Sequence, residues 1–300
     1  MSKLTYLPFA DGKWRMSLGL KALNLKEWIE IDEHFADELR LKDKLLKTHY
    51  CDVFAALPES QPSQKEVLHL LINHLPEQFP HYYRSLDSRI ENLITGQVWD
   101  ISEFEAAPLD LAGRLVQEDL LIMHSSPEGY SLTAASLCFP LRWRLRDKIG
   151  RSLAQIHSPV PGYHDQLERR VDSFFDRLQP ECPTWRLNWS IVDSPELFFP
   201  PNQGTQGVKT TINAENARDT LWLRVERQTL QRLKVSHDIL FTIRTYVHPL
   251  HVLEDDPVTA HNLAEAIKQM PPEMQSYKNL LSVREALLDY LDQIAAAGLI

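Results

Sequence analysis

Arginine recurs on one side of three segments that alternate apolar with polar residues. Trp185–Val192, Leu221–Gln228 and Ile239–Val247 have the period of strands that are buried on one face. A planar guanidinium binds carboxylates with two parallel hydrogen bonds, so arginines gathered on one face could bind an anionic cofactor group. Ion pairs, such as Glu226 with Arg224 or Arg244, are the alternative reading, and the spacing leaves both open. The predicted polar face carries Arg186, Asn188, Arg224, Glu226, Arg244 and Tyr246.

A histidine continues the apolar stripe of a predicted helix over Arg142–His157. Leu145, Ile149 and Leu153 are spaced four apart, and His157 is the next position before a Ser-Pro-Val-Pro-Gly stop. Such a ring should face the interior, where a neutral imidazole is a good metal ligand. It could equally be a core histidine that donates to a backbone carbonyl.

The elements that would position these residues are short and mixed. The last two strands should pair antiparallel, and the Pro-Glu-Gly turn within Val116–Thr133 predicts a β-hairpin. Pro200–Gly207 is the main loop candidate. The sequence therefore predicts an α+β fold in one domain, residues 1–300, with helices at both ends of the chain. Extended segments are expected over Lys13–Leu20 and Glu27–Ile31, and further helices over Phe35–Lys47, Pro62–Leu75, Leu86–Ile94, Pro108–Gln117, His164–Leu178, Val258–Gln269 and Lys278–Ala296.

Charge and cysteine content narrow the class of protein. The net charge of −9 disfavours nucleic acid and anionic membrane surfaces as partners. No run approaches 18 apolar residues, and the start does not have the pattern of a signal peptide. Cys51, Cys138 and Cys182 form no CxxC, which predicts free thiols in the cytoplasm rather than disulfides or a zinc or iron–sulfur site. The nucleotide-binding, P-loop, zincin and α/β-hydrolase motifs are absent.

Three long segments resemble the haem-dependent oxidative N-demethylase family, formerly catalogued as a domain of unknown function. They are LRVERQTLQRLKVSHDILFTIRTYVHPL (Leu223–Leu250), CFPLRWRLRDKIGRSLAQIHSPVPGY (Cys138–Tyr163) and WRLNWSIVDSPELFF (Trp185–Phe199). The start, MSLGLKALNLKEWIEID, is similar as well. The resemblance runs from about residue 8 to about residue 295.

This resemblance implies a PAS-like antiparallel sheet that binds haem b. It implies oxygen-dependent N-demethylation of a small secondary amine such as dimethylamine. The electrons would come from NAD(P)H through a separate flavin and iron–sulfur reductase, because this chain contains neither centre. A haem-binding sensor or carrier without turnover is the alternative.

Residue roles follow the matched motifs and the expected polar face. The IHSPVPG segment offers His157 as the axial ligand of the iron. Glu226 would bind the protonated amine, and Tyr246 would donate a hydrogen bond to bound oxygen. The haem propionates would be held by Arg186, Arg224 and Arg244.

Overall fold

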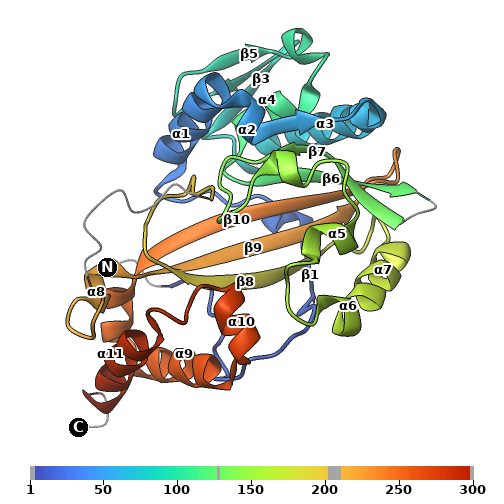
Figure 1. Cartoon of the computed structure of the whole chain (residues 1–300). Coiled ribbons are helices and arrows are strands. Elements are labelled where there is room, and N and C mark those ends of the chain that lie inside the picture. The colour runs from blue at the N-terminus through green and yellow to red at the C-terminus, as the bar shows by residue number, and fades with distance from the viewer. Residues whose placement is uncertain (1–3, 127–128, 202–210, 298–300) are drawn as a thin grey trace.

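A large antiparallel sheet forms the centre of the molecule (Figure 1). The computed structural model describes residues 4–126, 129–201 and 211–297. In these residues seven strands follow the spatial order β1-β8-β9-β10-β6-β7-β2. Their bounds are β1 Lys21–Ala22, β2 Phe54–Ala56, β6 Asp119–Ser126, β7 Gly129–Ser136, β8 Thr184–Val192, β9 Trp222–Arg232 and β10 Ile239–Pro249.

The predicted strand pairings are confirmed. β9 and β10 pair antiparallel along their whole length, and β6 and β7 form the hairpin expected within Val116–Thr133. β8 pairs with the other side of β9, so β9 and β10 lie in the middle of the sheet. The mixture of helices with a large antiparallel sheet agrees with the predicted class. The division of the chain into one domain stays a prediction.

The sheet has two faces, which we call front and rear. Asn188, Glu226 and Phe241 mark the front face, which is turned toward the viewer in Figure 1; Leu187, Val225 and Arg244 mark the rear face. Front-face residues such as Leu121 and Leu230 belong to one small apolar cluster. This cluster takes in the short helices α5 Leu153–His157 and α7 Glu168–Arg177, with α6 Tyr163–Gln166 between them.

The rear face is covered by helices from both ends of the chain. The first group, drawn in blue and green above the sheet in Figure 1, packs on Leu120, Ile122 and Leu240. The second, drawn in orange and red below it, packs on Leu223 and Val225. The first group is α1 Phe35–Thr48, α2 Tyr50–Val53, α3 Gln61–Gln78 and α4 Pro108–Leu115, beside a small sheet of β3 Tyr83–Leu86, β4 Arg89–Asn92 and β5 Val98–Asp100. The second is α8 Ala217–Thr220, α9 Pro257–Gln269, α10 Pro272–Tyr277 and α11 Arg284–Ala297.

The predicted helix over Arg142–His157 is wrong. Residues 145–147 form a single 3-10 turn and residues 148–150 a further turn, which brings the chain beside β7, where Gly150 N donates to Leu132 O at 2.7 Å. A new helix, α5, begins only after Ser152, whose side chain accepts from Gln155 N in a capping box. The stripe that led to His157 therefore joins two separate elements.

Other local predictions also need correction. Leu86–Ile94, expected as a helix, belongs to β3 and β4, which meet at a turn where Asp87 has a positive φ of 49°. Glu27–Ile31 contains the end of a 3-10 helix and no strand. Lys13–Leu20 pairs with no strand, and pairing begins only at β1.

The helices expected at Phe35–Lys47, Pro62–Leu75, Pro108–Gln117 and Val258–Gln269 are confirmed within a few residues. His164–Leu178 divides into α6 and α7, and Lys278–Ala296 is helical only from Arg284.

Most of the Pro200–Gly207 loop lies outside the described residues. No helix in the described part of the chain has the length and apolar character needed to cross a membrane. All three cysteines are free, and only Cys138 is buried.

Candidate functional site

The front face brings together the polar residues of β8 and β9. Arg186 lies opposite Gln228, Asn188 opposite Glu226, and Ser190 opposite Arg224. Residues paired across antiparallel strands point to the same side, so these residues share one surface. This part of the predicted polar face is confirmed.

Arg244 and Tyr246 lie on the rear face, so the prediction that they share the front face is wrong. Tyr246 pairs with Val225 and Arg244 with Arg227, the neighbours that point away from Glu226. Thr245, between them, is the residue that pairs with Glu226. Neither predicted side chain can reach a ligand bound on the front face.

The rear-face pair makes structural ion pairs and hydrogen bonds. The guanidinium of Arg244, which is 1% exposed, lies 2.8 Å from Glu38 and 2.5 Å from Asp32. Tyr246 donates to Glu30 Oε2 at 2.5 Å. For Arg244 the ion-pair alternative therefore holds, with partners other than Glu226.

Glu226 is held as a hydrogen-bond acceptor at the middle of the front face. Asn188 Nδ2 and Gln228 Nε2 both approach its Oε2 atom, at 3.3 and 3.0 Å. Arg224 Nε lies 3.9 Å from Oε1. Both amides donate to Oε2, and Oε1 is left without a hydrogen bond among the described residues.

Arg224 supports the walls of the site instead of opening into it. Its Nη2 donates to Phe139 O at 2.5 Å, and its Nη1 donates to Leu197 O at 3.3 Å and Glu196 O at 3.5 Å. Burial lowers the pKa of this guanidinium. These bonds tie two loops to β9 and leave only Nε without a hydrogen bond.

Arg186 has no such partners. Within the described ranges no hydrogen bond or ion pair reaches its guanidinium, and its Nε is buried. Burial lowers the pKa of Arg186, while the nearby Glu226 carboxylate acts in the opposite direction. A half-buried cation without a hydrogen-bonding partner is costly, so this position suits an anionic group of a ligand.

His157 is turned so that one ring nitrogen is available. Its Nδ1 lies 2.9 Å from Leu153 O, and a carbonyl can only accept, so Nδ1 carries the proton. Tyr163 stacks on the ring at 4.6 Å between centroids. Burial lowers the pKa of His157, and the charges of Lys148 and Arg186 lower it further. Nε2 therefore holds a free electron pair and bonds to none of the described residues.

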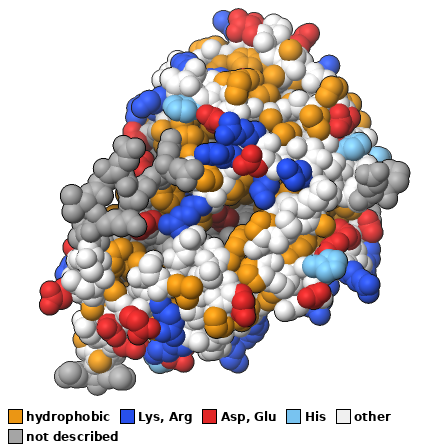
Figure 2. All heavy atoms as spheres, in the orientation of Figure 1, with side chains coloured by type: hydrophobic (Ala, Val, Ile, Leu, Met, Phe, Trp, Pro, Cys, Tyr) orange, Lys and Arg blue, Asp and Glu red, His pale blue; other side chains and the backbone are white. Residues whose placement is uncertain are grey.

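The apolar residues of the front face are incompletely covered at its centre. On β10, Phe241, Ile243 and Val247 point forward and are only half-buried, although Thr242 and Arg244 behind them are fully buried. Figure 2 shows a recess on this side of the molecule, with basic side chains near its rim. An apolar surface in a central strand normally lies under other residues, so the recess suits a flat apolar ligand.

Lys278 is a site residue that the sequence did not suggest. Its Nζ donates to Trp189 O at 2.6 Å and to Asn188 Oδ1 at 3.4 Å. Burial lowers its pKa to about 8, with Glu226 opposing and Arg186 adding to the shift. It lies in the segment between α10 and α11, where no pattern marks it.

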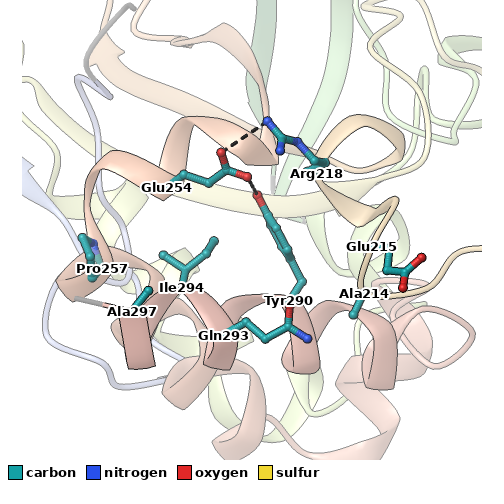
Figure 3. A pocket seen from close by; sticks show the side chains of 9 residues that line it. All are labelled: Ala214, Glu215, Arg218, Glu254, Pro257, Tyr290, Gln293, Ile294 and Ala297. Atoms are coloured by element: carbon teal, nitrogen blue, oxygen red, sulfur yellow. Dashed lines mark hydrogen bonds and ion pairs between the residues drawn. The ribbon is translucent and has the colours of Figure 1, made fainter. Parts of the chain in front are cut away.

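Two surface grooves lie away from these residues. One, of about 440 Å³, lies between α8, α9 and α11 (Figure 3). Three of its polar side chains contact each other, since Glu254 accepts from Tyr290 at 2.9 Å and lies 3.3 Å from Arg218. The other, of about 540 Å³, is lined by Leu18, Phe174 and the arginines of α7.

No group of three or more metal-binding side chains occurs among residues 4–126, 129–201 and 211–297. Haem does not require one, since the porphyrin supplies four nitrogens and the protein one or two ligands.

The chain was also compared with models of known protein families. Residues 19–288 match the model of the family described as haem-dependent oxidative N-demethylase, alpha subunit-like. The match spans most of the chain, and the protein belongs to this family. The resemblance noted in the sequence is thereby confirmed, and the family description indicates haem dependence.

The residues of the front face fit haem. The free Nε2 of His157 suits iron, the unpaired Arg186 suits a propionate, and the half-buried side chains of β10 suit the flat porphyrin. His157 Nε2 and the Arg186 guanidinium have no bonding partner among the described residues, while Phe241 and Ile243 pack on one side against the front-face cluster and stay half-exposed.

Proposed function

We propose that this chain binds haem b on the front face and catalyses oxidative N-demethylation of a small secondary amine such as dimethylamine. His157 Nε2 would bind the iron. The observation that carries the proposal is that two nitrogen groups from different elements, His157 Nε2 on α5 and the Arg186 guanidinium on β8, bond to none of the described residues. Dioxygen is the second substrate, and a separate flavin and iron–sulfur reductase delivers electrons from NAD(P)H.

The remaining roles follow from the contacts. Arg186 binds a haem propionate, while Arg224 holds the Phe139 and Leu197 loops that wall the site. Glu226 binds the ammonium form of the substrate through Oε1, the oxygen that the amides leave free. Arg244 and Tyr246 have no part in this site.

Bound haem supplies the activation of dioxygen and the oxidation of the N-methyl group. Glu226 would hold and orient the amine through Oε1, the carboxylate oxygen that accepts from neither amide. Nδ1 of His157 keeps its proton through the bond to Leu153 O, which fixes the orientation of the ring. The half-buried residues of β10 limit access of water to the porphyrin face.

The wider setting is part of the same proposal. The central strands β8, β9, β10, β6 and β7 would form a PAS-like sheet, with helices α5–α7 over the haem. The free cysteines and acidic surface favour the cytoplasm, and no nucleic acid or membrane is involved.

The test has two stages. The full chain, expressed with haem supplied, should show a Soret band, and a pyridine haemochrome spectrum should identify haem b. With an NAD(P)H-dependent reductase, dimethylamine and oxygen, it should then release formaldehyde.

Glu226→Gln should cut the formaldehyde yield at least tenfold with haem content intact, whereas Glu215→Gln, in a distant groove, should not. Haem binding without turnover of any secondary amine would point to a sensor or carrier; a colourless protein would end the proposal.

A further inference from the structure

Lys278 lies where β8 has an unpaired edge. Among the described residues β1 pairs with β8 only at Thr184 and Trp185, so no described strand pairs with Trp189 on that side. Lys278 Nζ donates to Trp189 O at 2.6 Å and thereby satisfies this carbonyl. The same Nζ lies 3.4 Å from Asn188 Oδ1.

The contact with Asn188 selects one orientation of the amide. An ammonium group has only donors, so the Asn188 atom that faces it must be the oxygen. The Asn188 NH₂ group must then point the other way, toward Glu226 Oε2 at 3.3 Å. Gln228 donates to the same oxygen from its own strand.

We propose that Lys278 is a positioning residue, which acts through Asn188 to hold Glu226 as a charged acceptor with Oε1 directed to the ligand. If Asn188 turned over, its oxygen would face Glu226 Oε2 and repel it. Lys278 prevents this while it caps the edge of β8. The inference relies on the proposed function only for the nature of the ligand.

The charges around Lys278 agree with this role. Glu226 and Arg186 are the charged groups that act on it, and burial lowers its pKa only to about 8, so the ammonium form prevails at neutral pH. Removing the ammonium group should therefore change the orientation of Glu226, in addition to removing the hydrogen bond to Trp189 O at the edge of β8.

A double-mutant cycle tests the connection. We suggest the haem-loaded full chain, dimethylamine as the probe, and isothermal titration calorimetry as the measurement. Lys278→Met and Asn188→Leu should each weaken binding about tenfold, since each removes one hydrogen bond to or toward a charged group. The double variant should also lose about tenfold, because both changes act through one carboxylate.

Two further variants separate positioning from structural support. Lys278→Arg presents only donors and should bind dimethylamine within about twofold of the unchanged protein. Lys268→Met removes a surface lysine paired with Glu265 and Asp292, and should have no effect. A hundredfold loss in the double variant, or full affinity in Lys278→Met, would overturn the inference. If Lys278→Met does not fold, Asn188→Leu decides, since Lys278 keeps its bond to Trp189 there.

A second readout does not depend on the amine. The carboxyl ¹³C resonance of Glu226, assigned from its loss in Glu226→Gln, should move in Lys278→Met or Asn188→Leu and stay fixed in Lys268→Met. If the unchanged protein binds no dimethylamine, the proposed substrate fails, yet a moved resonance still supports the positioning role. An unmoved resonance overturns it.

Discussion

Arg224 and Arg244 lie on adjacent strands and point to opposite faces of the sheet. Arg224 pairs with Val247, whereas Arg244 pairs with Arg227. Both side chains are 1% exposed, but one anchors the loops around the front recess and the other neutralises carboxylates behind the sheet. The two arginines therefore stabilise different layers, and neither has a free guanidinium for a ligand. That property belongs to Arg186.

His157 is the first residue to test. His157→Ala should abolish or shift the Soret band, because the only imidazole we assign to the iron is removed. His164→Ala is a matched control: His164 is exposed on α6 and bonded to Glu168. Absorption spectra of both variants at equal haem supply decide the matter, and an unchanged band in His157→Ala would remove this histidine from the site.

Loss of the charge should affect haem binding at Arg186 and the stability of the haem-free chain at Arg224. Arg186→Met should weaken haem binding by about tenfold or more, since one charge-assisted contact is lost, without lowering the stability of the haem-free chain. Arg224→Met should destabilise the haem-free chain by about 3 kcal/mol, because three carbonyls lose their donor. Haem titration and urea unfolding measure the two effects. Equal destabilisation by both substitutions would contradict the distinction.

Tyr246 should matter for stability and not for chemistry. Tyr246→Phe removes a hydrogen bond to Glu30 on the rear face and should cost about 1 kcal/mol of unfolding free energy. Haem content and formaldehyde yield should stay within about twofold of the unchanged protein. A tenfold lower yield at equal haem content would return Tyr246 to the site, as the sequence first suggested.

The sequence predicted the strands β8, β9 and β10 well but not which residues share a face. Across β8 and β9 the numbers of paired residues add to an even number, so Arg186, Asn188, Arg224 and Glu226 face together. Across β9 and β10 they add to an odd number, so even-numbered residues of the two strands face apart. A shift of register by one residue would reverse this. The length of the turn between β9 and β10 sets this register. The alternation of apolar and polar residues within each strand does not predict it.

His157 was found through a helix that does not exist. Leu145, Ile149 and His157 have helical spacing, but Gly150, with a φ of 75°, and the Ser152 capping box break the segment. The Ser-x-x-Gln motif at Ser152 predicts a helix that begins there. The apolar stripe, which runs through this position, favours a longer helix instead. The histidine is nevertheless half-buried at the end of α5, where its ring stacks on Tyr163.

Lys278 and the rear-face ion pairs could not be predicted at all. They join residues far apart in the sequence, such as Asn188 with Lys278 and Glu38 with Arg244. These contacts form only when helices from both ends of the chain pack onto one sheet. The secondary-structure propensity of a short segment does not predict contacts between residues so far apart in the sequence.

Glu118 is a buried carboxyl whose charge should limit stability at neutral pH. Its side chain is fully buried; Oε1 accepts from Glu30 N at 3.0 Å, and Oε2 has no hydrogen-bond partner in the described part of the chain. Burial raises its pKa to about 7, against the opposing charge of Arg244. Between the ordinary pKa of a glutamate and 7, the folded state thus binds a proton that the unfolded state has lost. Stability must fall as pH rises through this window.

Glu118→Gln should therefore remove a pH-dependent penalty. At pH 8 the variant should be more stable than the unchanged protein by an amount on the order of 3 kcal/mol, from the shift in pKa. Near pH 5 the two should unfold at similar urea concentrations, since the carboxyl is then protonated in the folded state. Glu215→Gln, at an exposed carboxylate, should leave the pH profile unchanged. An equal difference in unfolding free energy at both pH values would show that Glu118 does not titrate in this window.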